Sequence, residues 1–199
     1  MPKRVDHEER RRRIAEALWR IASTRGLDGA SLRDVAAEAG ISLGQLQHYF
    51  SSKDEMLVFA LVHIGDLATH RIGERLRTLS AEPAPRDVLR ESIKEMLPLD
   101  DESRTGHLVQ VAYFARAVHD ERLRGHAKEG VPALREFFAG QVRAGIARGE
   151  ITADRDPDTE AALLVSLIDG LGSYALLEVW PAEEALRLVD AHLERLFTP

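Results

Sequence analysis

The chain has 199 residues, of which 44% are hydrophobic and 30% charged, as expected for a globular protein that can bury a sizeable core. It has no cysteine, which excludes disulfides, thiolate metal sites and thiol redox chemistry. The first residues lack the apolar segment of a signal peptide, and no run of about 18 apolar residues is present to span a bilayer. We therefore expect a cytoplasmic protein without a membrane partner.

The formal net charge of −6 is unevenly distributed along the chain. Residues 1–53 hold ten of the 27 Lys and Arg but seven of the 33 Asp and Glu, so this segment is basic by three charges and the remainder is acidic by nine. Because charges in physiological salt act over about 8–10 Å, a basic head can attract DNA phosphates although the whole chain is acidic. For the arginine run at residues 10–13 alone, a solvated charged face is the simpler interpretation.

Apolar residues recur at helical spacing, and no segment alternates with the period of two that is typical of a strand, so the pattern predicts an all-α fold. The first helix is expected at about residues 7–25 and ends at Gly26, followed by a turn at 27–30. Ser31 is placed to cap a second helix, with Asp34 at the capping-box position, and Gly40 ends that helix after about ten residues.

A third helix begins directly afterwards, with Ser42 as its cap. Its apolar residues lie on one side, and the opposite side is polar and uncharged. The residues on that opposite side are Gly44, Gln45 and His48. Ser52 then opens a fourth helix, with Glu55 in a second capping box. Two short helices joined by residues 40–42 are typical of a helix-turn-helix, whose second helix enters a DNA major groove.

This segment also resembles the N-terminal DNA-binding domain of the tetracycline-repressor (TetR) family of transcriptional regulators. The match extends over residues 10–62 and is carried by SLRDVA at 31–36, GIS at 40–42, HYF at 48–50, and the residues Gly44, Leu46, Ser52 and Lys53. The resemblance implies a homodimer with one helix-turn-helix per subunit, bound to an operator with two-fold symmetry. It also implies a C-terminal helical domain that binds a small molecule and then releases the DNA.

Carried over position by position, the resemblance implies two kinds of DNA contact. The residues at bases or the groove wall would be Arg33, Leu43, Gly44, Gln45 and His48, and those at phosphates would be Ser31, Tyr49 and Lys53. Gln47 stands where the family often has tyrosine, and its amide could instead pair with adenine. Gln47 and the cap Ser42 complete the predicted DNA-binding set. Tyr49 and Phe50 are aromatic, so each could instead pack in the core. We expect core packing for Phe50 but not for Tyr49.

The fourth helix is expected to run from Lys53 to about Leu79, and it would connect a DNA-binding domain at residues 1–56 to a ligand-binding and dimerisation domain at 57–199. On it, three potential metal ligands fall at spacings of three and four, and they are His63, Asp66 and His70. A solvated polar stripe is the commoner arrangement, and the sequence points to no further ligand. We therefore predict no metal site and no cofactor.

Further helices are expected at 85–96, 103–118, 121–129, 132–148, 157–179 and 182–197. On the second of these, polar residues stand among apolar ones, as in a satisfied core or in the orienting groups of a ligand pocket. The sequence leaves both interpretations open. The candidate pocket residues are Met96, His107, Gln110, Tyr113, Phe114, Phe137, Phe138 and Trp180. They would suit a small, largely apolar effector.

The helix expected at 157–179 is apolar on two faces, so it must be covered on both. In the family that the chain resembles, the last two helices pair with their copies across a dimer interface. The residues predicted for that interface are Leu164, Val165, Ile168, Leu171, Gly172, Leu186, Val189 and Leu193. A buried hairpin in a monomer is the alternative.

The leading functional hypothesis is a ligand-responsive transcriptional regulator, and specifically a repressor on a palindromic operator. An enzyme that contains a helix-turn-helix is the second class, but no catalytic triad order, phosphate loop or metal motif supports it. A DNA-binding or scaffold protein without a ligand is the third. An enclosed cavity with convergent polar groups would distinguish the first class from the third.

Overall fold

The computed structural model describes residues 2–26 and 31–198, with side chains from His7 onward. All regular structure in these residues is helical, which confirms the predicted all-α fold. The helices are α1 (Pro2–Arg25), α2 (Leu32–Glu38), α3 (Leu43–Tyr49), α4 (Lys53–Leu79), α5 (Pro85–Met96), α6 (Asp101–Ala117), α7 (Glu121–Ala147), α8 (Pro157–Leu176) and α9 (Ala182–Leu196). The turn expected at 27–30 lies outside the described residues.

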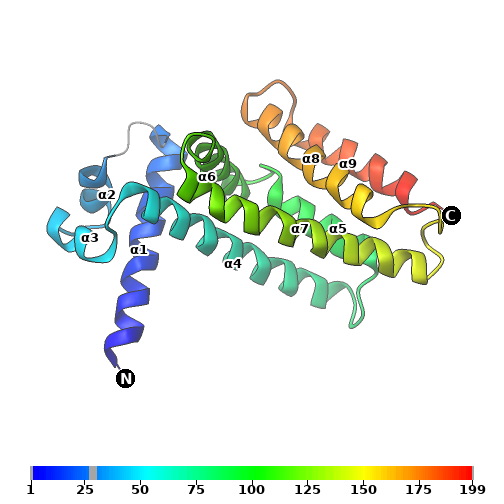
Figure 1. Ribbon diagram of the computed structural model, residues 1–199, viewed down its shortest axis with the longest axis horizontal. Helices are drawn as coiled ribbons and strands as arrows, with labels where there is room; N and C mark the ends of the chain where they lie inside the picture. The colour runs from blue at the N-terminus through cyan, green and yellow to red at the C-terminus, as the bar shows by residue number, and fades with distance from the viewer. Residues whose placement is uncertain (1, 27–30, 199) are drawn as a thin grey trace.

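The molecule is elongated, with the short helices α2 and α3 at one end (Figure 1). Helix α4 leads away from them, and α5, α6 and α7 pack along it. Helices α8 and α9 form a hairpin that packs on α5 and α7. This is the predicted arrangement of an N-terminal helix-turn-helix domain and a C-terminal helical bundle.

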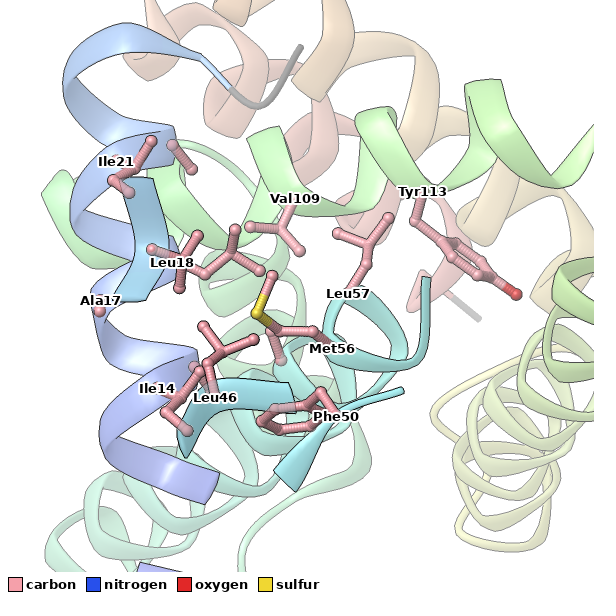
Figure 2. Close-up of a cluster of buried hydrophobic side chains, with 14 of the residues drawn as sticks. Ile14, Ala17, Leu18, Ile21, Leu46, Phe50, Met56, Leu57, Val109 and Tyr113 are labelled. Carbon is pink, nitrogen blue, oxygen red and sulfur yellow. The ribbon is translucent and has the colours of Figure 1, made fainter. Parts of the chain in front are cut away.

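Two hydrophobic cores hold the helices together. The first gathers apolar side chains from α1, α2, α3 and the start of α4, and it also includes Val109 and Tyr113 of α6 (Figure 2). The second lies among α5, α7, α8 and α9. The predicted division after residue 56 is therefore bridged by a continuous core, because α6 completes the packing of the helix-turn-helix unit.

Helix α7 corrects the sequence-based expectation of separate helices at 121–129 and 132–148. The structure has one continuous helix, which contains Pro132. A proline inside a helix removes one hydrogen bond and typically costs about 3 kcal/mol. Residues 128–133 are exposed, so water can satisfy the freed carbonyl of Lys128. Leu123 and Phe138 are buried on either side of the proline, and their packing keeps the helix continuous.

Smaller differences occur at helix ends. Helix α1 starts at Pro2, before the expected residue 7, and α6 starts at Asp101, because Asp100 caps it through the backbone N–H of Ser103. Helix α8 ends at Leu176, before the expected residue 179. There Glu178 adopts a φ of 56°, a left-handed conformation that no α-helix continues.

Four of the residues predicted for the dimer interface do not face outward. Leu164, Ile168, Val189 and Leu193 are completely buried in the core of their own subunit, so their side chains cannot contact a second one. The other predicted residues also face this core or its edge: Val165, Leu171, Gly172 and Leu186. The opposite face of α8 is exposed at Leu163, Tyr174 and Leu177.

Helix α8 is also the one helix in the described ranges that is long and apolar enough to cross a membrane. Core helices of globular proteins meet the same criterion, and α8 has one face packed against α7 and α9.

Candidate DNA-binding surface

The turn between α2 and α3 is set by local hydrogen bonds. At the start of α2, Asp34 N–H donates to Ser31 Oγ (3.2 Å) and Ser31 N–H donates to Asp34 Oδ2 (2.8 Å), which is the predicted capping box. The Ser31 hydroxyl also donates to Asp34 Oδ2 (2.5 Å), and this bond, followed by the one from the Ser31 N–H, lowers the pKa of Asp34. Gly40 has a φ of 67°, which lets the N–H of Ile41 return to the carbonyl of Ala36 (2.9 Å) and stop the helix.

Helix α3 presents an uncharged polar face to solvent. Leu46 and Phe50 point into the first core and are buried, as expected for Phe50. The exposed residues of α3 are Gly44, Gln45, Gln47 and His48, while Leu43 and Tyr49 are half-buried. Ser31, Arg33 and Ser42 are exposed nearby, and Lys53 is half-buried at the start of α4. The structure thus brings the predicted DNA-binding residues to one end of the molecule.

Gln45 has a structural role that the sequence analysis missed. Its N–H donates to Ser42 Oγ (3.2 Å), and its side-chain carbonyl accepts from the N–H of Ser42 (2.9 Å). This is a complete capping box, and the Ser-x-x-Gln spacing that signals it is visible in the sequence. The side-chain oxygen of Gln45 is therefore already bonded at the start of α3.

His7 of α1 lies against the C-terminal end of α3, a contact that no motif indicated. Its ring centroid is 4.9 Å from that of Tyr49 and 6.2 Å from that of His48. Tyr49 is thus packed between α1 and the core edge, which explains its partial burial.

Arg11 fastens α1 to the connection between α3 and α4. Its guanidinium carbon lies 4.7 Å from the ring centroid of Phe50 and 4.4 Å from that of Phe59, and Nη2 donates to Glu55 Oε1 (3.2 Å). The other carboxylate oxygen of Glu55 accepts from the N–H and Oγ of Ser51, both at 2.8 Å. These Ser51 bonds are the main reason why the pKa of Glu55 is lowered, and Arg11 adds to the effect.

Two expectations are corrected here. The solvated face expected for residues 10–13 does not include Arg11, whose side chain is only 22% exposed. The capping box expected at Ser52 is half formed, because Ser52 Oγ accepts from the N–H of Glu55 while the Glu55 carboxylate turns to Ser51.

Ion pairs connect α4 to the C-terminal helices. Arg116 of α6 donates through Nε to Asp54 in the first turn of α4 (2.8 Å). Further along α4, Arg71 and Arg75 both pair with Glu95 of α5, whose side chain is only 2% exposed. Both ends of α4 are thus fixed to the bundle that would sense a ligand.

Three of the eight predicted pocket residues lie together between α5, α6 and α8. His107 Nδ1 lies 3.1 Å from the carbonyl of Met96, and Gln110 Nε2 donates to Asp169 Oδ1 (2.9 Å). The imidazole also presses on Gly172, where an added Cβ would lie 2.6 Å from Nε2. Burial lowers the pKa of His107 and raises that of Asp169.

The remaining five lie elsewhere. Tyr113 donates to the carbonyl of Leu123 (2.5 Å) in the first core, with Phe114 beside it. Phe138 is buried in the second core, whereas Phe137 and Trp180 are exposed. None of the eight lines the two hollows of about 560 Å³ that the structure shows, one between α1, α4 and α6 and one between α1, α4 and α7.

The potential metal ligands on α4 do not form a site. Within the described residues, no three His, Asp or Glu side chains are arranged to hold an ion. His63 instead stacks on Trp19, with ring centroids 5.2 Å apart and planes at 20°, and burial lowers its pKa. Asp66 and His70 are exposed.

A short, uncharged polar helix on a helix-turn-helix, attached to an all-helical bundle, defines a DNA-binding transcriptional regulator. Comparison with known proteins agrees: residues 14–58 match the bacterial regulatory proteins of the tetR family, and residues 85–198 match the C-terminal domain of BetI-type transcriptional repressors. The chain belongs to the TetR family of transcriptional regulators.

Individual relatives are regulators of the same kind. The chain is 35% identical to the HTH-type transcriptional regulator PksA of Bacillus subtilis, over 89% of this chain and 84% of that protein. It is 29% identical to the regulator BetI of Burkholderia mallei, over 100% and 99% of the two chains. A TetR-family regulator from Rhodococcus sp. superposes with a TM-score of 0.83 at 27% identity, covering 96% of this chain and 100% of that one. A regulator from Saccharomonospora viridis, solved in complex with choline, superposes with a TM-score of 0.82 at 26% identity, covering 94% and 96%.

Proposed function

We propose that this regulator is a repressor that binds a palindromic operator as a homodimer and is released by a small molecule. The observation that carries the proposal is the exposed, uncharged face of α3, which is held rigidly by its capping box and by the Arg11 contacts. Such a face suits the base edges of a major groove about 12 Å wide. The match of residues 85–198 to the C-terminal domain of BetI-type transcriptional repressors supports the repressor role.

The DNA contacts follow from the placement of the side chains. Gln47 and the free amide group of Gln45 are exposed beside His48 and can meet base edges, whereas Ser31 and Tyr49 flank the helix and suit phosphates. Lys53 lies in the first turn of α4, whose N-terminus also favours an anion. Base contacts would set sequence preference, and the phosphate contacts would set orientation.

The dimer is supported by the outward face of α8. Leu163 is 53% exposed, Tyr174 48% and Leu177 70%, and Trp180 packs beside Tyr174 with ring centroids 5.1 Å apart. A helix whose other face is already buried leaves this apolar face for a second subunit. A two-fold interface between α8 and α9 and their copies would cover it and place two α3 helices on one side of a duplex.

The effector would bind in the C-terminal bundle, in the cytoplasm. The polar pair of Gln110 and Asp169 and the imidazole of His107 lie among apolar side chains, as orienting groups in a largely apolar site do. His107 Nε2 is buried without a hydrogen-bond partner in the described residues and packs against Gly172, so a ligand would reach it when α6 and α8 move apart. One similar regulator was solved in complex with choline, which is a small molecule.

Selection from a random DNA library tests the proposal. We expect enrichment of a palindrome whose half-sites are about 34 Å apart, or one helical turn, bound by two subunits. Screening small molecules against the selected duplex then identifies those that dissociate the complex. Enrichment of non-palindromic sites bound by one subunit would contradict the dimeric operator, and a complex unaffected by all ligands would contradict the release step.

A further inference from the structure

The hollow between α1, α4 and α6 lies apart from the effector site proposed above. The three helices contact one another at the junction of the DNA-binding helices with the bundle (Figure 1). The hollow has a volume of about 560 Å³, which is within the usual range for small-molecule sites. The lining residues that matter here are Glu16, Trp19, Ile64, Leu67, Asp101 and Thr105.

The wall of this hollow offers an aromatic and aliphatic surface. Trp19 is half-buried and stacks on His63 on one face, so a bound molecule would meet the rest of the ring. Leu67 also lines the hollow and is 38% exposed, so a bound molecule could cover its side chain. At Ile64 the helices are in close contact, because a Cβ on Gly106 would lie 3.1 Å from Ile64 Cγ2. The hollow therefore has a firm apolar side.

A donor in this wall lacks an acceptor. The indole Nε1 of Trp19 is buried and has no hydrogen-bond partner among the described residues. Buried tryptophan N–H groups usually find a partner, because an unmet donor is costly. This N–H is shut off from solvent, so a molecule in the hollow would contact other atoms of the Trp19 indole rather than Nε1.

The charges around the hollow favour a cation. Arg20 is already paired with Glu38 (2.7 Å), and Arg71 is paired with both Glu95 (2.7 Å) and Glu102 (2.9 Å). The carboxylates of Glu16 and Asp101 line the hollow, and neither forms an ion pair within the described part of the chain. Negative charge is therefore left unneutralised beside an aromatic ring, which attracts organic cations.

We propose that this hollow is a second ligand site, for an amphiphilic organic cation. The apolar body packs on Trp19 and Leu67, and the cationic group lies towards Glu16 and Asp101. Because α1 belongs to the DNA-binding helices and α4 and α6 to the bundle, an occupant bridges the two. Any effect on operator binding rests on the proposed function, whereas the binding itself does not.

The two tryptophans of the chain allow a direct test, since Trp180→Phe leaves Trp19 as the single indole. The probe is benzoylcholine, an aromatic ester of a quaternary ammonium alcohol, and its neutral carbon isostere is 3,3-dimethylbutyl benzoate. In the Trp180→Phe protein without DNA, we expect saturable quenching of Trp19 fluorescence by benzoylcholine. We expect the neutral ester to bind at least about tenfold more weakly than benzoylcholine.

Variants locate the site. Glu16→Gln with Asp101→Asn should weaken benzoylcholine binding about tenfold, whereas Glu129→Gln with Glu183→Gln, which removes the same charge from exposed positions elsewhere, should not. Asp169→Asn should leave the Trp19 signal intact, because that carboxylate lies between α6 and α8. Circular dichroism confirms that each variant is folded.

Three results would overturn the proposal: no saturable quenching, equal binding of the cation and its isostere, or equal effects of the two charge-neutralising pairs. None of these measurements involves DNA, so the ligand-binding result can be interpreted even if the operator experiments fail. A protein that binds its operator normally but shows no Trp19 response would refute this site alone.

Discussion

Arg11 shows how one side chain can fix the position of a recognition helix. Its guanidinium lies between Phe50, the residue that ends α3, and Phe59 of α4, and its Nη2 bonds to Glu55. A planar guanidinium can stack on two rings and still donate hydrogen bonds, which the compact ammonium of lysine cannot do. The orientation of α3 therefore depends on a residue outside the helix-turn-helix itself.

We expect Arg11→Lys to destabilise the fold by about 1–2 kcal/mol and to weaken binding to all DNA sequences, since it keeps the charge but loses the stacking. Urea unfolding and filter binding to specific and random duplexes measure the two effects. Arg13→Lys is the matched control, because Arg13 is exposed and pairs with Glu9 in the same helix. Equal behaviour of the two variants would show that the aromatic contacts do not matter.

The two glutamines of α3 should respond differently to substitution. Gln47→Ala should relax preference at particular base pairs, by about 1–3 kcal/mol of discrimination, without changing stability. Gln45→Ala should do the same and also cost about 0.5–1.5 kcal/mol of stability, because its carbonyl caps α3. Binding to an operator library and urea unfolding separate the two roles. An unchanged sequence profile in both variants would remove the base-reading role.

His107 makes stability depend on pH. Burial lowers its pKa in the folded state, so the unfolded chain binds the proton more tightly. The stability from keeping His107 neutral is fully present above about pH 6.5 and is lost as the pH falls through the lowered pKa. His107→Gln keeps a donor for Met96 and should reduce the slope of unfolding free energy against pH by up to about 1.4 kcal/mol per pH unit. His63 and His192 have the same sign and remain in the variant, so an unchanged slope would assign the effect to them.

At the scale of whole elements, close packing at small residues decides how the helices meet. Helix α6 lies against α8 where the imidazole of His107 occupies the space left by Gly172. The adjacent pair Gln110–Asp169 continues the same contact by a hydrogen bond. These two helices therefore meet through a polar seam, whereas α8 meets α7 and α9 through apolar side chains.

Gly172→Ala should destabilise the protein by about 1–3 kcal/mol, since the new methyl would overlap the imidazole of His107. Gly140→Ala is the matched control, because a Cβ there meets nothing within 4 Å and alanine is the better helix former. Thermal unfolding of both variants measures the difference. A stabilised Gly172→Ala protein would mean that α6 and α8 separate easily.

At the scale of the whole molecule, the outward face of α8 is an exposed apolar surface. We expect Leu163→Glu with Leu177→Glu to convert a dimer to a folded monomer and to abolish operator binding. Val62→Glu is the control, because Val62 is similarly exposed but lies on α4. Sedimentation and gel-shift measurements report the two outcomes. A dimer that survives the double substitution would place the interface elsewhere.

Sequence reasoning succeeded where local chemistry decides the structure. The caps at Ser31 and Ser42 and the stop at Gly40 follow from side-chain and backbone preferences that neighbouring residues alone satisfy. It could not choose between the two apolar faces of α8, because periodicity does not tell whether a face meets its own subunit or another. Pro132 also misled it, since packing at Leu123 and Phe138 outweighs the local preference. The DNA-contact and pocket roles remain predictions.

The core that α6 completes has a consequence for engineering. Val109 and Tyr113 fill space beside Leu57 and Leu18, so cutting the chain after residue 56 would leave that space open to water (Figure 2). A chimeric sensor that borrows only the first three helices would carry an unfinished interior and tend to aggregate. A graft that keeps α4, α6 and the start of α7 with the first three helices would transfer the whole of this core, because Leu123 of α7 also belongs to it.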